Sequence, residues 1–340
     1  MIKNKQILLF FCLLFTLNCY ADTETKKDSI SVNFLSGEYK FLLDQDSLKA
    51  SLLRLRDNQS SGIELPTTLF QPAVDKINAL QKELKLADWL VYQLIRRLAE
   101  QINSKYEDYT QYTITKYALL TAVGFEPVIY NSKEKILLYV KSSDTIYNLP
   151  NKRINGKQYV CLNYHDYAFQ INFQLEKFYK QFEQIEKEGR DFHYNITYLP
   201  SFQKSSYVEK TISFNYRHKL ESFRVPVYTE MQDYFTNYPV TEYRYQFNIP
   251  FSEITYNTLI PELKSRVKKL TLEKGVEYLM LFVRDGFEFE TDTKLFGREK
   301  RLSAEETLIL SSSDYEDRSA LFFSLVKEIY DLPMAILSYP

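Results

Sequence analysis

The segment SSSDYEDRSALFFSLVKEIYDLPMAILSYP, from Ser311 to Pro340, combines a polar loop, an apolar helix and the beginning of a strand. Either Ser313 or Asp314 can cap the helix, and the acids that follow suit its positive end. Apolar residues recur at helical spacing, at Leu321, Phe322, Leu325, Val326 and Ile329. The pattern predicts a capped helix that is buried along one side and has Tyr315 at its first turn.

Chain length, net charge and aromatic content limit the class of protein. A chain of 340 residues is long enough for two or three domains. A net charge of -1, with no basic half, argues against a nucleic-acid partner, which needs a positive surface. The 28 Tyr and 24 Phe indicate a fold rich in strands. A surface that stacks on sugars or binds a partner is the second interpretation of these aromatics.

The N-terminus is typical of a secretory signal peptide. Lys3 and Lys5 precede an apolar run, Ile7–Leu17, that is too short to span a bilayer, and small residues allow cleavage after Ala21. We therefore expect residues 1–21 to be removed and the mature protein to be periplasmic or extracellular, with no transmembrane segment. The alternative is a lipoprotein acylated at Cys19.

Cysteine usage then excludes two kinds of site. The chain has three cysteines, two of which lie in the signal, so the mature protein keeps only Cys161. Neither an intramolecular disulfide nor a cysteine-ligated metal can form.

Three regions are expected after the signal. The first, 22–190, is an α+β domain. We expect helices at 80–102 and 110–123, strands at PVIY, EKILLYVKSS and KQYVCLNYH, and an amphipathic helix at 174–191. The second, 191–250, is an antiparallel β module, because TISFNYRHKL and EYRYQFNI alternate aromatic and polar residues. The third, 251–340, has a helix beginning near Pro261.

A short internal similarity, called the echo below, links the first and third regions. Asp108, Tyr109, Thr113 and Pro127 align with Asp314, Tyr315, Ser319 and Pro333, each 206 residues further on (314 − 108 = 206). Both segments read as helix, turn, proline and strand. The echo suggests two related α+β units on either side of a β module.

The residues GFEFETDTKLFGREKRLSAEETL (286–308), followed by SDYEDRS, resemble the transglutaminase-like superfamily of papain-like thiol enzymes, in its bacterial exported branch. In that family the second stretch reads Asp-Cys-Glu-Asp-Arg and opens a buried helix. Asp314, Glu316, Asp317 and Arg318 match this pattern, but Tyr315 stands in the place of the cysteine. The family's histidine and aspartate would lie beyond Pro340. The unit from Tyr109 to Val140 looks like a degenerate copy of the same fold.

The resemblance implies that catalysis is lost. The family's thiolate forms at a helix start and exchanges a proton with a histidine. A tyrosine at that place titrates near ~10 and is a poor acyl-transfer nucleophile. We expect no catalytic residues, with Tyr315 as the degenerate nucleophile position, and no cofactor or metal.

Other chemistry has little support. Cys161 and His165 are four apart in the expected strand, which places them on one face but ~13 Å apart at ~3.3 Å per residue, too far for proton transfer. We interpret Cys161 as a packing residue, and His193 and His218 as strand or surface residues. No phosphate-binding glycine loop, dinucleotide fingerprint or serine-hydrolase elbow is present.

Three hypotheses remain open. The first is an exported, catalytically inactive transglutaminase-like protein that acts as a binding or assembly module for a protein, peptide or glycan. The second is a truncated fragment of an enzyme for thiol acyl transfer or amide hydrolysis. The third is a periplasmic glycan- or peptide-binding β protein whose site includes Tyr243 and Tyr245.

Overall fold

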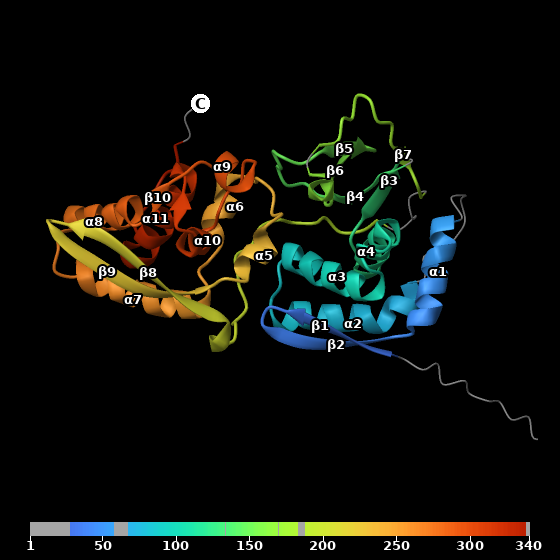
Figure 1. Ribbon diagram of the computed structural model, residues 1–340, viewed down its shortest axis with the longest axis horizontal. Coiled ribbons are helices and arrows are strands. Elements are labelled where there is room, and N and C mark those ends of the chain that lie inside the picture. The colour runs from blue at the N-terminus through green and yellow to red at the C-terminus, as the bar shows by residue number, and fades with distance from the viewer. Residues whose placement is uncertain (1–27, 58–66, 133, 169, 183–187, 338–340) are drawn as a thin grey trace, which may run out of the picture.

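The computed structural model describes residues 28–132, 134–168, 170–182 and 188–337, apart from the segment 58–66. The predicted signal peptide lies outside these residues. The described chain is α+β with predominantly antiparallel strand pairing, as expected, and forms two halves that lie side by side in Figure 1. No helix in the described ranges is both long and apolar enough to cross a membrane.

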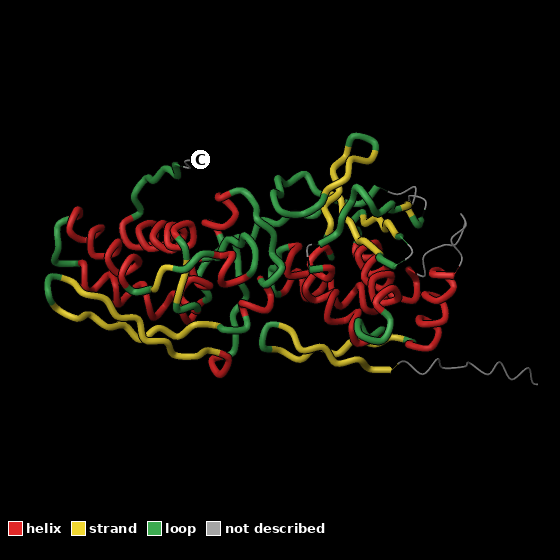
Figure 2. The backbone as a smooth tube through the Cα atoms, turned by 45° about the horizontal axis from the view of Figure 1, so that its top comes forward, coloured by secondary structure: helices red, strands yellow, loops and turns green. Residues whose placement is uncertain are grey.

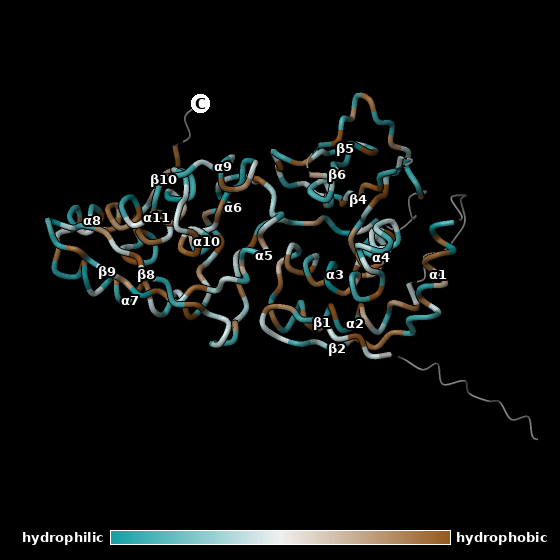
Figure 3. The backbone as a smooth tube through the Cα atoms, in the orientation of Figure 1, coloured by the Kyte–Doolittle hydropathy of each residue, from teal (hydrophilic) through white to brown (hydrophobic). Residues whose placement is uncertain are grey.

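The N-terminal half begins with a hairpin and four helices. Strands β1 (Asp28–Phe34) and β2 (Gly37–Leu43) pair antiparallel. Helices α1 (Gln45–Asp57), α2 (Thr67–Glu83), α3 (Asp88–Ile102) and α4 (Tyr109–Val123) follow. Figure 3 shows hydrophobic and polar residues interspersed along α2 and α3, as expected of helices that bury one side.

The prediction of a single helix at 80–102 is wrong at its N-terminal end. Helix α2 ends at Glu83, and α3 begins only at Asp88. Between them Lys85 has a positive φ of 50°, which breaks the helical path, and Leu86 is buried. The apolar spacing continues across the break, so periodicity alone could not reveal it.

The expected helix at 110–123 and the strands after it are confirmed. Gly124, at φ 100°, ends α4 in the left-handed conformation that favours glycine. Strands β3 (Pro127–Asn131), β4 (Ile136–Lys141), β5 (Asn151–Ile154), β6 (Lys157–Cys161) and β7 (Tyr179–Lys180) form one antiparallel sheet in the order β5-β6-β4-β3-β7. Asn155 and Gly156, both at positive φ, turn the chain between β5 and β6.

The sheet has an apolar cluster on one face and helix α4 on the other. All six residues of β4 are buried, because this strand packs against neighbours on both faces. Cys161 is fully buried in the cluster with Val128, Leu137, Tyr139 and Tyr159. Its interpretation as a packing residue is confirmed.

Two expected elements are wrong. The stretch 174–191 is no amphipathic helix in its described part: it contains a turn and the short β7, while 183–187 lie outside the described residues. EYRYQFNI is not a strand but helix α6 (Tyr243–Asn248), preceded by α5 (Met231–Phe235). The alternation of aromatics arises there because one short helix packs rings on several sides.

The expected β module is reduced to one hairpin. Strands β8 (Tyr207–Tyr216) and β9 (Lys219–Tyr228) pair over their whole length, and Ile212 and Phe214 are buried as predicted. The predicted alternation does not continue to Leu220, because the chain turns at His218 and Leu220 is exposed. The ring of Phe214 meets Phe282 of α8 at 5.7 Å. Figure 2 shows the hairpin along the helices of the C-terminal half, so its core belongs to that half.

The C-terminal half is largely helical. It contains α7 (Glu253–Val267), α8 (Leu272–Asp285), α9 (Asp292–Phe296), α10 (Ala304–Ile309) and α11 (Tyr315–Tyr330). Two short strands, β10 (Glu288–Phe289) and β11 (Ser312–Ser313), pair parallel. Pro261 lies inside α7 rather than at its start, which corrects the expected boundary. Residues 332–337 form no strand, so the echo with α4 and β3 stops at the helix.

Helix α5 joins the two halves. Trp89, buried on α3 as expected for a core residue, donates its indole N–H to the carbonyl of Tyr234 at 2.8 Å. The Tyr234 hydroxyl accepts a bond from the backbone N–H of Leu35 at 2.6 Å. These buried contacts tie the β1–β2 hairpin and α3 to the segment leading into the C-terminal half.

Candidate functional site

The predicted helix cap is present at the start of α11. The Oδ1 atom of Asp314 accepts bonds from the backbone N–H groups of Glu316 (2.9 Å) and Asp317 (3.1 Å). This satisfies two of the orphan donors of the first turn. Of the predicted buried stripe, Leu321, Leu325, Val326 and Ile329 are buried, whereas Phe322 is half-buried.

Tyr315 projects from this first turn into solvent. Its side chain is 71% exposed, and its ring packs on that of Phe289, with 4.6 Å between centroids. Phe289 is itself 48% exposed. The parallel pairing of β10 with β11 places Phe289 beside the helix start, since Phe289 is in register with Ser313. The two rings, here called the aromatic pair, form an exposed apolar surface.

Acidic side chains lie beside Tyr315. Asp314, which precedes Tyr315 in the chain, is half-buried, whereas Glu288, the neighbour of Phe289, lines a cavity behind β10. Glu316 accepts bonds from the Tyr243 hydroxyl (2.8 Å) and from Nε of Arg301 (3.2 Å). The acidic rim therefore consists of Asp314 and Glu316, of which Glu316 is paired with Arg301, and the guanidinium of Arg318 lies 5.8 Å from the ring centroid of Phe289.

Arg318 and Asp317, the other matched residues, face inward. The Arg318 guanidinium donates to the carbonyls of Phe287 (2.8 Å) and Arg284 (3.1 Å) and so fastens β10 to α11. Asp317 is fully buried, and its Oδ1 atom accepts from the N–H of Leu302 at 2.8 Å. Burial, together with the negative charge of Asp314, raises the pKa of Asp317 to about 9.

No base stands against Tyr315. The expected strand position of His165 is wrong, because β6 ends at Cys161 and His165 lies in a 3-10 turn (Tyr164–Tyr167). His193 lies beside Asp144 at 3.3 Å, and His218 at the tip of the β8–β9 hairpin. Cys161 is buried in the other half, and burial raises the pKa of its thiol to about 12. Across the described residues, the groups needed for thiol chemistry are thus remote from the helix start.

The third hypothesis, a binding site on a strand that carries Tyr243 and Tyr245, is not supported, because these residues are helical. Tyr243 and Tyr245 lie on α6, where both hydroxyls are used within the protein: Tyr243 donates to Glu316, and Tyr245 to Asp144 at 3.0 Å. The guanidinium of Arg301 lies 3.8 Å from the ring centroid of Tyr243. These tyrosines serve packing between elements rather than an open strand face.

The second Asp-Tyr helix start, at α4, is half-buried in a polar cluster that sequence reasoning missed. Asp108 caps the helix, and the Tyr109 hydroxyl donates to Asp166 (2.7 Å) and accepts from the amide of Asn163 (2.8 Å). Burial and the Asp166 charge raise the pKa of Tyr109. Lys105 also pairs with Asp166, at 2.6 Å. The polar run after β6, Asn-Tyr-His-Asp, was the available signal.

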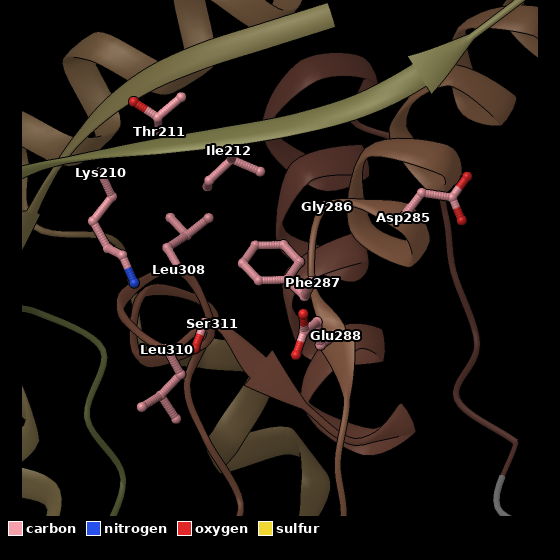
Figure 4. A pocket seen from close by; sticks show the side chains of 10 residues that line it. All are labelled: Lys210, Thr211, Ile212, Asp285, Gly286, Phe287, Glu288, Leu308, Leu310 and Ser311. Carbon is pink, nitrogen blue, oxygen red and sulfur yellow. The ribbon is translucent and has the colours of Figure 1, made fainter. Parts of the chain in front are cut away.

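A cavity of about 300 Å³ lies behind β10. Figure 4 shows Lys210 reaching into it from β8, with Leu308 and Phe287 beside it and Asp285 turned away. The Lys210 ammonium donates to the carbonyl of Ile309, so its positive charge is already engaged. The aromatic pair does not line this cavity.

Comparison with known protein families, with curated proteins and with solved structures finds no match.

Proposed function

We propose that this protein is an exported, non-catalytic binding module of the transglutaminase-like kind, whose contact surface is the start of α11. The observation that carries the proposal is the exposed aromatic pair, Tyr315 with Phe289. The resemblance aligns Tyr315 with the family's nucleophile. Exposed tyrosine is enriched in binding surfaces because it offers a large, rigid contact area.

The rim of the surface indicates the chemistry of the ligand. Ring faces attract cations, and the carboxylates of Asp314 and Glu316, which flank Tyr315 in the chain, add negative charge beside them. We therefore propose a peptide or unfolded segment that carries Lys or Arg as the ligand. Its side chain would lie on the rings with the charge directed to the acidic rim.

Catalysis is not part of the proposal. Acyl transfer needs a nucleophile and a base within hydrogen-bond reach of one another. A phenol without an adjacent imidazole supplies neither at neutral pH. The function that remains for an accessible helix start is recognition.

A peptide-array measurement tests the proposal. The purified chain should bind basic peptides more tightly than their Glu-substituted counterparts, and the double variant Tyr315→Ala/Phe289→Ala should lose at least tenfold in affinity. Tyr106→Ala is the matched control, because Tyr106 is 92% exposed but lies in the N-terminal half.

Two results would contradict it. One is binding to glycans with no binding to peptides. The other is turnover, measured as amine incorporation into a glutamine-containing protein or as amide hydrolysis.

A further inference from the structure

Three aspartates from two helix starts converge beside the aromatic pair. Asp292 opens α9, Asp314 caps α11, and Asp317 lies in the first turn of α11. One carboxylate oxygen of each lies within 4.8 Å of the other two. Asp292 and Asp317 are 3% and 0% exposed, so this cluster is largely shielded from water.

The hydrogen bonds of the cluster do not involve all of its carboxylate oxygens. The Oδ2 atom of Asp292 accepts from the N–H of Lys300 (2.7 Å), and Oδ1 of Asp317 accepts from Leu302. The remaining oxygens, Oδ1 of Asp292 and Oδ2 of Asp317, are buried and accept no hydrogen bond. Buried carboxylate oxygens without a partner are costly, which points to a missing positively charged ligand.

Nearby basic side chains are largely directed elsewhere. The Lys300 ammonium binds Glu306 at 2.9 Å, and Arg318 binds backbone carbonyls. The Arg298 guanidinium donates to the carbonyl of Thr236, and its charge also acts on Asp292. The charges of Lys300 and Arg318 also reach Asp292 and Asp314, but none of these cations donates a hydrogen bond to Oδ1 of Asp292 or Oδ2 of Asp317.

We propose that Asp292, Asp314 and Asp317 bind a hard divalent cation, Ca²⁺. Carboxylate oxygens are the ligands this ion prefers, and bonds of about 2.4 Å allow oxygens on opposite sides of it to be about 4.8 Å apart. The smaller Mg²⁺ needs a tighter octahedron. Asp314 also belongs to the acidic rim of the proposed peptide-binding surface, but the Ca²⁺ measurement uses no peptide, so the two proposals fail separately.

The affinity is expected to be modest. The positive end of the α11 dipole and Arg298 both oppose a cation. We expect a Kd in the range of extracellular Ca²⁺ modules, roughly 10⁻⁴–10⁻³ M. Saturating Ca²⁺ should then raise Tm by about 5 °C.

The experiment is thermal unfolding and calorimetry of the full chain, stripped with a chelator and titrated with Ca²⁺ alone or Mg²⁺ alone. Asp317→Asn and Asp292→Asn should each abolish the Ca²⁺ shift. The metal-free Asp317→Asn protein should melt no lower than the parent, because the amide fills the place of the buried carboxyl and its oxygen still accepts from the N–H of Leu302, so a folding defect cannot mimic lost binding. Asp285→Asn is the control, since Asp285 pairs with Arg284 at the surface.

The outcomes separate clearly. A Ca²⁺ shift that disappears in both cluster variants and persists in Asp285→Asn supports the site. Absence of a shift in the parent overturns it and means that the carboxyl groups share protons instead. A shift that survives in the cluster variants, or an equal response to Mg²⁺, overturns the assignment to Ca²⁺ at these residues.

Discussion

Replacing Lys116 with Met should stabilise the protein. Lys116 lies on α4 and is fully buried, and its ammonium nitrogen has no hydrogen-bond partner. Its nearest favourable contacts are the ring faces of Tyr112 and Tyr109, at 4.2 and 5.7 Å. Burial lowers the pKa of Lys116 to about 7, and the charge of Asp166 offsets only part of this effect.

The magnitude follows from the two pKa values. The side chain titrates at 10.5 when unfolded and at about 7 when folded, a difference of about 3.5. At about 1.36 kcal/mol for each pKa unit, the buried charge costs up to about 5 kcal/mol below pH 7. Loss of the ring contacts removes about 1–2 kcal/mol of stabilisation. We therefore expect Lys116→Met to raise the free energy of unfolding by about 3 kcal/mol at pH 6–7.

The pH dependence has a definite sign. Between pH 7 and 10.5 the unfolded chain holds a proton on Lys116 that the folded chain does not, so stability of the parent rises with pH across this window. The advantage of the variant should therefore shrink steadily above pH 7.

Guanidinium unfolding at pH 6 to 9 measures this effect, with Trp89, the only tryptophan, as the fluorescent probe of the N-terminal half. Lys82→Met is the control, because Lys82 is exposed on α2. A variant that is less stable than the parent, or an advantage that does not change with pH, would refute the reasoning.

Four further substitutions have defined outcomes. Tyr315→Cys should give an exposed thiol that reacts with a disulfide reagent in the native state, unlike the buried Cys161, but no faster than free cysteine, because the surrounding carboxylates oppose the helix dipole. Glu305→Gln should cost about 1–3 kcal/mol in guanidinium unfolding, because the buried carboxylate accepts from both the N–H and the hydroxyl of Ser252, and an amide would turn a donor toward them. Tyr109→Phe should cost a similar amount through its lost buried hydrogen bonds, whereas Tyr315→Phe should change stability by under about 0.5 kcal/mol. Equal costs for these last two changes would contradict the different environments of the tyrosines.

Local signals explain which elements could be predicted. Helix α4 ends at a glycine in the left-handed conformation, and β5 and β6 are joined by Asn155-Gly156. In both places the residues at the boundary themselves favour the observed backbone conformation. The break at Lys85 and the helix α6 had no such signal. In both, tertiary packing selects one conformation from a pattern that fits two.

Only part of the candidate site could be predicted from the sequence, for a related reason. Asp314, Tyr315 and Asp317 are neighbours in the chain, so the capped helix start could be expected. Asp292 and Phe289 join them only because β10 pairs with β11, which brings a segment more than twenty residues away to the same place. Non-local strand pairing of two residues leaves almost no trace in the sequence.

The two Asp-Tyr helix starts show why a local motif does not define a site. Both tyrosines follow a capping aspartate and occupy the first position of a long helix. In the N-terminal half the β6 turn covers the helix start, and Tyr109 becomes a hydrogen-bonding partner inside a polar cluster. In the C-terminal half the described chain leaves Tyr315 open to solvent on a phenylalanine ring. Because only an accessible helix start can meet a ligand, the same motif has a structural role at Tyr109, and recognition is best sought at Tyr315.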